Sequence, residues 1–191
     1  MALLRRTIGL GRGLWSMAAA LAILGARPVS AQTVQASASE VQAVFLFNFA
    51  QFVDWPAEAF PDPHAPLVIG ILGKDPFGDF LDETVRGETV RGRTFRVDRY
   101  RHVEDVRECQ ILFISRSETK RLDSILTALK GKPILTVSNG DDFDRGGGII
   151  RFILDKSKIR LSVDLEAAQA ARLTFSSKLL RSAEIVPPSG R

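Results

Sequence analysis

Two short apolar runs constrain the fold more than any other feature of the chain. "LVIGIL" at residues 67–72 and "QILFIS" at residues 110–115 each have the length of a strand and show no alternation of polar and apolar positions. A strand with one face in water would alternate, so such runs are typical of strands buried on both faces of a parallel sheet. "PILTVS" at residues 133–138 has the same character. We therefore expect a parallel sheet with helices on both faces.

Helical signals lie between these runs. Asp75 and Pro76 are typical of the start of a helix, and a second helix is expected from about Ser117 to a stop at Gly131. "GIIRFILD" and "KIRLSVDL" flank a short "KSK" turn at residues 156–158, which indicates an antiparallel hairpin, and "EAAQAARL" and "SSKLLRSAEIV" are expected to be helical. The prediction is an α/β fold, a single three-layer domain with a mixed sheet of about six strands (a parallel core plus a C-terminal antiparallel hairpin) flanked by helices.

The N-terminal segment has the three parts of a secretory signal peptide. Three arginines between positions 5 and 12 precede the apolar run "LWSMAAALAILG", and "VSA" offers a small-residue cleavage site. The run is shorter than the roughly 20 residues of a membrane-spanning helix. We therefore expect cleavage near Ala31 and export to the periplasm. The expected organisation is a signal peptide at 1–31, a disordered leader at 32–39, an α/β domain at 40–187 and a tail at 188–191.

The net charge of the chain comes from this segment alone. The formal charge is +4, and residues 1–31 contain four arginines and no acidic residue. Without these four, 22 basic residues face 22 acidic ones. The exported domain is therefore about neutral, and its charge gives no reason to expect a nucleic-acid partner.

Residues that carry catalysis or bind metals are sparse. The chain has two histidines, His64 and His102, and one cysteine, Cys109, and none of them lies at metal-ligand spacing from another. A single cysteine excludes an intramolecular disulfide, and no G-x-S-x-G motif follows any expected strand. We therefore expect no catalytic residue, no metal site and no cofactor.

The ends of the two apolar runs offer one place for a small ligand. The carboxyl ends of adjacent parallel strands form a crevice, and a helix that starts there presents free N–H groups. Gly73 and Asp75 follow the first run, and Ser115 and Ser117 follow the second. These four residues are the candidate small-ligand site, although a capped helix start explains them equally simply.

A phenylalanine-rich helix poses the question of what covers it. Between Val41 and Val53 only Gln42, Asn48 and Gln51 are polar, and they do not cluster on a helical wheel. The sheet can cover one side of this helix, and either the proline-rich loop at residues 55–66 or another protein chain must cover the rest. Asn48 is expected to bond a backbone segment, because a buried amide needs partners.

If another chain covers the helix, its contacts can be assigned by face. Phe45, Phe49 and Phe52 share one face and are expected in the core. Leu46, Phe47 and Val53 point elsewhere and are then the candidates for a partner or dimer surface. If the domain itself encloses the helix, the C-terminal hairpin and the "SSKLLRSA" segment are the next candidates. The candidate contact residues are Leu46, Phe47, Asn48, Val53, Trp55, Ile150, Phe152, Leu179 and Leu180.

Several blocks along the chain together resemble the YfiR family. The blocks are "AVFLFNFAQFVDWPAEAF", "LVIGILGKDPFGDFL", "CQILFIS", "GKPILTVSNGDDFDRGGGIIRF" and "IRLSVDLEAAQAARLTFSSKLLRSAEIV". The resemblance extends from about residue 41 to residue 186, nearly the whole chain after the signal peptide, and rests on the order and spacing of the blocks.

The resemblance implies a regulator that acts by protein contact. YfiR-like proteins are periplasmic α/β domains and are often dimeric. The namesake of the family represses a membrane-bound diguanylate cyclase through its periplasmic sensor part, and an outer-membrane lipoprotein relieves the repression. This implies an influence on cyclic-di-GMP and biofilm formation. Disulfides of some family members do not carry over, because Cys109 is alone. A periplasmic small-ligand binding or sensor module remains the alternative.

Overall fold

The apolar runs form neighbouring parallel strands in the centre of the sheet. The computed structural model describes residues 30–141, 143–144 and 146–186. In it β2 (Leu67–Leu72) lies beside β5 (Ile111–Ile114), and β5 lies beside β6 (Leu135–Ser138). Every residue of the three strands is buried. The expected parallel core with two covered faces is therefore confirmed.

The main sheet has eight strands rather than about six, in the order β10-β8-β7-β6-β5-β2-β4-β3. The pairs β7–β8 and β3–β4 are antiparallel and all other neighbours are parallel. A second, two-stranded sheet joins β1 to β9. The remaining strands are β1 (Val53–Asp54), β3 (Thr89–Val90), β4 (Arg93–Tyr100), β7 (Ile150–Asp155), β8 (Lys158–Val163), β9 (Thr174–Phe175) and β10 (Ala183–Ile185).

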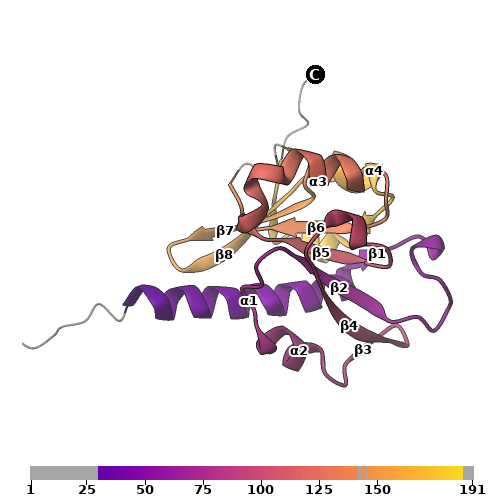
Figure 1. The fold of residues 1–191 in the computed structure, drawn as a ribbon, viewed down its shortest axis with the longest axis horizontal. Helices are drawn as coiled ribbons and strands as arrows, with labels where there is room; N and C mark the ends of the chain where they lie inside the picture. The colour runs from indigo at the N-terminus through magenta and orange to yellow at the C-terminus, as the bar shows by residue number, and fades with distance from the viewer. Residues whose placement is uncertain (1–29, 142, 145, 187–191) are drawn as a thin grey trace, which may run out of the picture.

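Helices cover both faces of the sheet, as predicted. The long helix α1 (Ser30–Phe52) and α2 (Asp79–Val85) lie on one face, and α3 (Leu122–Leu129) lies on the other (Figure 1). Each face has its own apolar cluster: Phe49 of α1 shares one with Ile71 of β2, and Ile125 of α3 shares the other with Leu72. Alternate side chains of the buried strands thus enter the two clusters, which gives a three-layer α/β domain.

Helix α1 begins earlier than predicted. The segment 32–39, expected as a disordered leader, continues the helix in the structure, and Ala38 is already buried. No glycine or proline interrupts the sequence between Ser30 and Phe52, so nothing local stops the helix. The expected signal peptide lies outside the described residues except for its last two positions, and so does the tail. Over the part of the chain that is described, no helix combines the length and the apolar character that crossing a membrane requires.

One of the two short C-terminal segments also differs from the prediction. α4 (Leu165–Ala170) is a helix as expected, but the "SSKLLRSAEIV" segment forms only the one-turn helix α5 (Ser177–Leu180) before β10. Strand β10 pairs with β8, with Ala183 opposite Leu161. The free edge of β8 thus takes up a segment whose own pattern is helical, because pairing outweighs a weak local preference.

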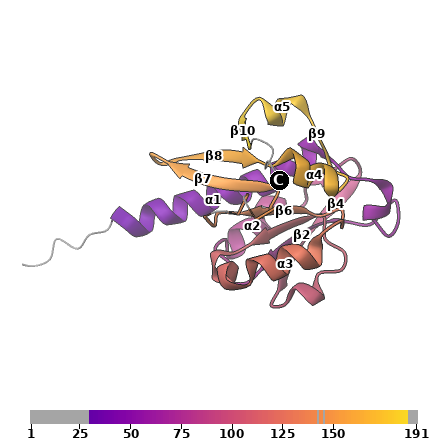
Figure 2. The same ribbon diagram turned by 90° about the horizontal axis from the view of Figure 1, so that it is seen from above.

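The predicted hairpin is present, and it projects from the sheet. Lys156 and Ser157 both have positive φ angles, 46° and 66°, so β7 and β8 are joined by a two-residue type I′ turn. Strand β6 pairs with β7 only as far as Ser138 opposite Arg151, whereas β8 pairs with β7 to its end. The outer part of the hairpin therefore runs beyond the sheet and alongside α1 (Figure 2). We call residues 152–160 the hairpin arm.

Candidate functional site

The predicted ligand residues do gather at the carboxyl ends of two adjacent strands. Strand β2 lies between β4 and β5, so the chain leaves β2 toward one side and later returns on the other. Gly73 follows β2, and Ser115 follows β5 and caps the short 3-10 helix η3 (Arg116–Arg121). This is the position at which open α/β sheets form a ligand crevice.

The crevice is filled by the chain's own side chains. The Ser117 hydroxyl accepts a hydrogen bond from the Lys74 amide (3.0 Å) and donates one to Glu118 (2.9 Å). Glu118 is buried and pairs with Arg121. A Cβ at Gly73, whose φ is +90°, would lie 2.4 Å from the Ser117 hydroxyl. The backbone approaches so closely here that no room is left for a ligand between Gly73 and Ser117.

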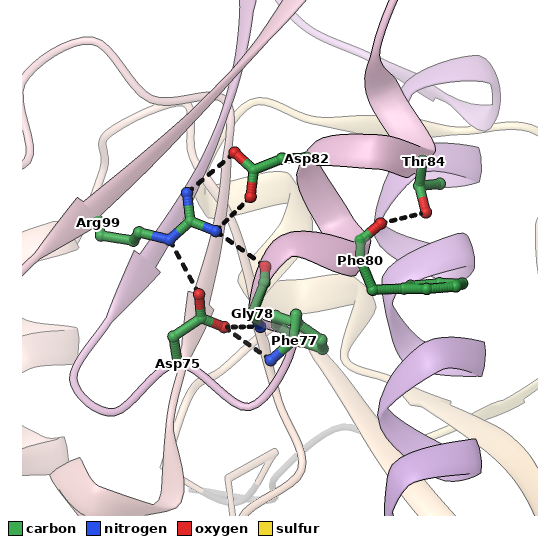
Figure 3. Close-up of polar contacts among 7 residues, drawn as sticks. All are labelled: Asp75, Phe77, Gly78, Phe80, Asp82, Thr84 and Arg99. Atoms are coloured by element: carbon green, nitrogen blue, oxygen red, sulfur yellow. Dashed lines mark hydrogen bonds and ion pairs between the residues drawn. The ribbon is translucent and has the colours of Figure 1, made fainter.

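Asp75 is likewise committed to the fold. One carboxylate oxygen accepts hydrogen bonds from the amides of Phe77 (2.7 Å) and Gly78 (3.3 Å), and the other accepts from Arg99 Nε (2.9 Å). Arg99, on β4, also pairs with Asp82 of α2 and donates to the Gly78 carbonyl (Figure 3). Helix α2 therefore begins at Asp79, three residues after Pro76, the expected first helical position, because Asp75 forms a turn ahead of the helix instead of capping it.

The Arg99 cluster was not predicted from the sequence. The hydrogen bonds from the Arg99 guanidinium lower the pKa of Asp82, so this carboxylate stays ionised in the folded protein. The sequence shows Arg99 only as one arginine of a charged strand. Its role depends on the pairing of β4 with β2, in which Ile71 lies opposite Arg99, and no local pattern specifies that register. The cluster ties α2 to the sheet and is structural.

The structure buries five of the nine predicted contact residues inside the domain. Their exposed fractions are at most 5%, and the five are Leu46, Val53, Ile150, Phe152 and Leu179. The other four are half-buried, namely Phe47, Asn48, Trp55 and Leu180. A partner can therefore touch only the second group without opening the domain.

Helix α1 is enclosed by the sheet and by elements on both flanks. Phe49 stacks on Phe152 of β7 with ring centroids 6.0 Å apart, and Phe47 packs against Phe95 of β4 at 5.2 Å. Phe45, predicted as core, is only half-buried and contacts Phe152 at 5.9 Å. Two neighbouring stripes of the helix thus face protein, so the predicted division into one core face and one contact face was too simple.

The proline-rich loop closes the other end of the sheet and is not the main cover of α1. Trp55 Nε1 donates to the Gln110 carbonyl (3.0 Å). The buried side chain of Gln110 accepts from the Val68 amide (2.8 Å) and donates to the Ala59 carbonyl (2.6 Å). This amide therefore joins the loop to the first residues of β2 and β5, at the amino ends of the parallel strands.

Two apolar side chains on the outer side of α1 are exposed. Val41 and Val44 are 42% and 40% exposed, whereas the polar Gln42 is 5% exposed. Gln42 accepts a hydrogen bond from the Asn139 side chain after β6 (3.3 Å). The amide that ties α1 to the sheet is thus Gln42, where Asn48 had been expected. Sequence periodicity could not show this, because the bonded loop lies 97 residues away.

One groove is lined by side chains that the sequence had not singled out. It has a volume of about 510 Å³ and lies between α3 and α4. Its lining includes the apolar Leu126, Leu129, Ile149 and Ala167, together with basic and acidic side chains such as Lys130 and Glu166. The groove therefore presents both apolar and charged groups. Within the described ranges, no group of three or more histidine, cysteine or acidic side chains has the geometry to hold a metal ion.

The fold defines an α/β domain in which the central strand ends at Gly73 and Ser115 are filled by the chain's own side chains. Comparison with protein families gives a match to the family described as YfiR/HmsC-like over residues 39–184. This is well over half of the chain, so the chain belongs to the YfiR/HmsC-like family. None of the curated proteins matches the chain. At the level of the family, membership supports a periplasmic, regulatory and non-catalytic protein connected with a diguanylate cyclase.

Proposed function

We propose that this chain is a periplasmic regulatory protein that acts by protein contact, without enzymatic activity of its own. It represses a membrane diguanylate cyclase through the periplasmic sensor part of that enzyme, and it thereby lowers cyclic-di-GMP and biofilm output. The observation that carries the proposal is the family match over residues 39–184. The filled crevice between Gly73 and Ser117 agrees with it, because the usual ligand position of such a sheet is closed.

The proposal includes export, a homodimer and a second partner. The pattern at residues 1–31 supports removal of a signal peptide, and the half-buried Phe47, Asn48, Trp55 and Leu180 are candidate contacts for the second copy or the partner. An outer-membrane lipoprotein that relieves the repression is the proposed upstream partner. Sedimentation of the purified chain tests the dimer, and a monomer at micromolar concentration would remove that part of the proposal.

The experiment that tests the proposed function compares cells with and without the gene. Deletion is expected to raise cyclic-di-GMP and matrix production, and the full chain supplied in trans is expected to restore both. A chain that lacks residues 1–31 serves as the matched control, because it contains the same domain but stays in the cytoplasm without the expected signal peptide. Unchanged cyclic-di-GMP after deletion would contradict the proposed function. Restoration by the control would contradict the periplasmic site of action.

A small-ligand module remains the second candidate, and the groove between α3 and α4 supports it. Because the strand ends at Gly73 and Ser117 are closed, a ligand would bind instead in this groove, which Leu126 and Ile149 help to line. A rise in melting temperature with a small periplasmic metabolite would favour this candidate. Loss of that rise in Leu126→Trp, which fills the groove, would place the ligand there.

A further inference from the structure

The hairpin arm leaves part of one strand edge without a neighbouring strand. In a two-residue hairpin the residues next to the turn bond each other, so Asp155 faces Lys158 with both hydrogen bonds formed. The alternation then points the backbone groups of Leu154 away from β8. The same alternation points the groups of Val163 away from β7, and there the Val163 carbonyl does accept from the Val186 amide at 2.9 Å. The observed bond supports the assignment.

The open groups belong to Phe152 and Leu154. The ladder between β6 and β7 ends with Ser138 opposite Arg151, which leaves the Phe152 amide as the last donor toward β6. Beyond it the Phe152 carbonyl and both backbone groups of Leu154 have no strand beside them in the described part of the chain. Such an edge is a template for an added strand.

An apolar surface accompanies this edge. Phe45 of α1 contacts Phe152 of β7. Val41 lies one helical turn farther out along α1, which is about 6 Å. Leu154 lies two residues farther out along β7, which is about 7 Å. Val41 is 42% exposed and Leu154 is 49% exposed. Figures 1 and 2 both show the hairpin running beside α1 toward the N-terminal end of the helix. An added strand could therefore bury side chains as well as satisfy backbone groups.

The base of the arm is fixed, so the edge is held in place. Asp144, which is buried, accepts a hydrogen bond from the Ser162 hydroxyl at 2.8 Å, and Arg151 Nε lies 3.1 Å from the same carboxylate. These contacts join the loop before β7 to both strands of the hairpin. A partner strand would meet a preformed edge and would not have to order it first.

Charge selects the partner. The hairpin arm carries Lys156, Lys158 and Arg160 against the single acidic Asp155. Arg160 forms ion pairs with Asp155 and with Glu184 of β10, so the two lysines at the turn supply the excess positive charge. Two such arms placed edge to edge would repel each other, whereas an acidic strand would be attracted. We propose that the open edge of β7 at Phe152–Leu154 binds an extended segment of the partner protein, with apolar side chains at alternate positions and acidic ones between them. The inference rests on the proposed function, because it assigns the contact surface to that regulation.

Leu154→Pro is the variant that tests the edge. Proline removes the outward N–H and its ring blocks the added strand, but it is tolerated where that N–H faces solvent. Ile159→Pro is the matched control, since Ile159 faces Leu154 across the hairpin and directs its N–H to the opposite edge. Leu154→Ala removes the side chain and keeps the amide. Melting temperatures of all three variants show whether the hairpin is intact.

The measurement is the affinity of the purified full chain for the purified periplasmic sensor part of the diguanylate cyclase whose output rises on deletion. We expect Leu154→Pro to bind about tenfold more weakly or worse, Leu154→Ala to lose less, and Ile159→Pro to bind as the parent does. Added salt should weaken the parent complex. If Leu154→Pro is destabilised, protection of the Leu154 amide from hydrogen exchange in the parent complex decides instead.

The outcomes separate the two proposals. Binding by the parent chain with no effect of Leu154→Pro, or no new protection of the Leu154 amide, overturns the edge while leaving the proposed function standing. Failure of the parent chain to bind at all overturns both. A change in the oligomeric state of Leu154→Pro with unchanged sensor binding also overturns the inference, because the edge would then serve a second copy.

Discussion

The two faces of helix α1 differ in what lies over them. On the covered face, Ala43, Leu46 and Phe49 are fully buried in the apolar cluster that α1 shares with the sheet. On the exposed face, Val41 and Val44 are about two-fifths exposed, and Gln51 is exposed as well. The contacts of each face, and not the hydrophobicity of its residues, therefore decide which positions belong to the core.

This difference predicts separate roles for the two faces. Changes on the covered face should lower the stability of the domain. Changes on the exposed face should leave stability unaffected and alter association instead, because few contacts there belong to the folded monomer. The predictions below test this separation.

The largest effect is expected at Phe49. Its ring is fully buried and stacks on Phe152, so Phe49→Ala removes a large core side chain and leaves a cavity. The free energy of unfolding should fall by about 3–5 kcal/mol. Urea denaturation measures it. A loss below about 1 kcal/mol would show that the covered face of α1 is not part of the cooperative core.

A smaller loss of stability is expected at Gln110, whose side chain joins the proline-rich loop to the beginning of β2. Gln110→Met keeps the side-chain volume but leaves the Val68 amide and the Ala59 carbonyl without their partner. The expected loss is about 1–3 kcal/mol in the same assay. Gln51→Met is the control, because Gln51 is exposed on α1, and it should be neutral. Equal effects of the two variants would contradict the assigned role of Gln110.

The third effect concerns the buried thiol of Cys109. Burial raises the pKa of this thiol from 9.0 to about 12. The folded protein therefore holds a proton that the unfolded chain releases above pH 9, and stability should fall as the pH rises from 9 toward 12, by up to about 1.4 kcal/mol per pH unit. Cys109→Ala should lose this part of the slope. An identical pH profile for both proteins would rule out the shift.

A cysteine placed on the exposed face sharpens the same comparison. In Val44→Cys the new thiol should react with a disulfide reagent at pH 8, whereas Cys109 should react more slowly by about tenfold or more, because its side chain is buried and burial disfavours the thiolate. Native-state labelling followed by mass spectrometry counts the reacted thiols. Modification of Cys109 at a comparable rate would mean that the domain opens readily around this residue.

The smallest effect is expected at Val44 itself. Val44→Ala should change the free energy of unfolding by no more than about 0.5 kcal/mol, because the side chain is 40% exposed. Melting temperature measures the change. A loss as large as that of Phe49→Ala would show that the exposed face of α1 is also core, and the separation of roles would fail.

The sequence predicted the centre of the fold well and its edges poorly. Strands β2 and β5 were predictable because burial on both faces leaves a continuous apolar run. Strands β1, β9 and β10 have two or three residues each and exist through pairing with distant segments, as Val53 does with Phe175. Local periodicity carries no signal for such pairs.

The candidate site shows the same division. Gly73 and Ser117 were correctly expected at neighbouring strand ends, because strand order follows from the alternation of strands and helices. Their mutual contact was not predictable, since it depends on how closely the backbone at Gly73 approaches the Ser117 side chain. A Cβ added at Gly73 would lie only 2.4 Å from the Ser117 hydroxyl. The open edge at Leu154 was equally hidden, because it results from where β6 stops.

Amide hydrogen exchange at Leu154 and Ile153 tests the account most directly. In the free protein the Ile153 amide points to β8 and should be protected, while the Leu154 amide points outward and should exchange faster by about two orders of magnitude. With the sensor part bound, protection should rise at Leu154 and stay unchanged at Phe113 in the core. Equal protection of the two amides in the free protein, or an unchanged Leu154 amide in the complex, would contradict the account.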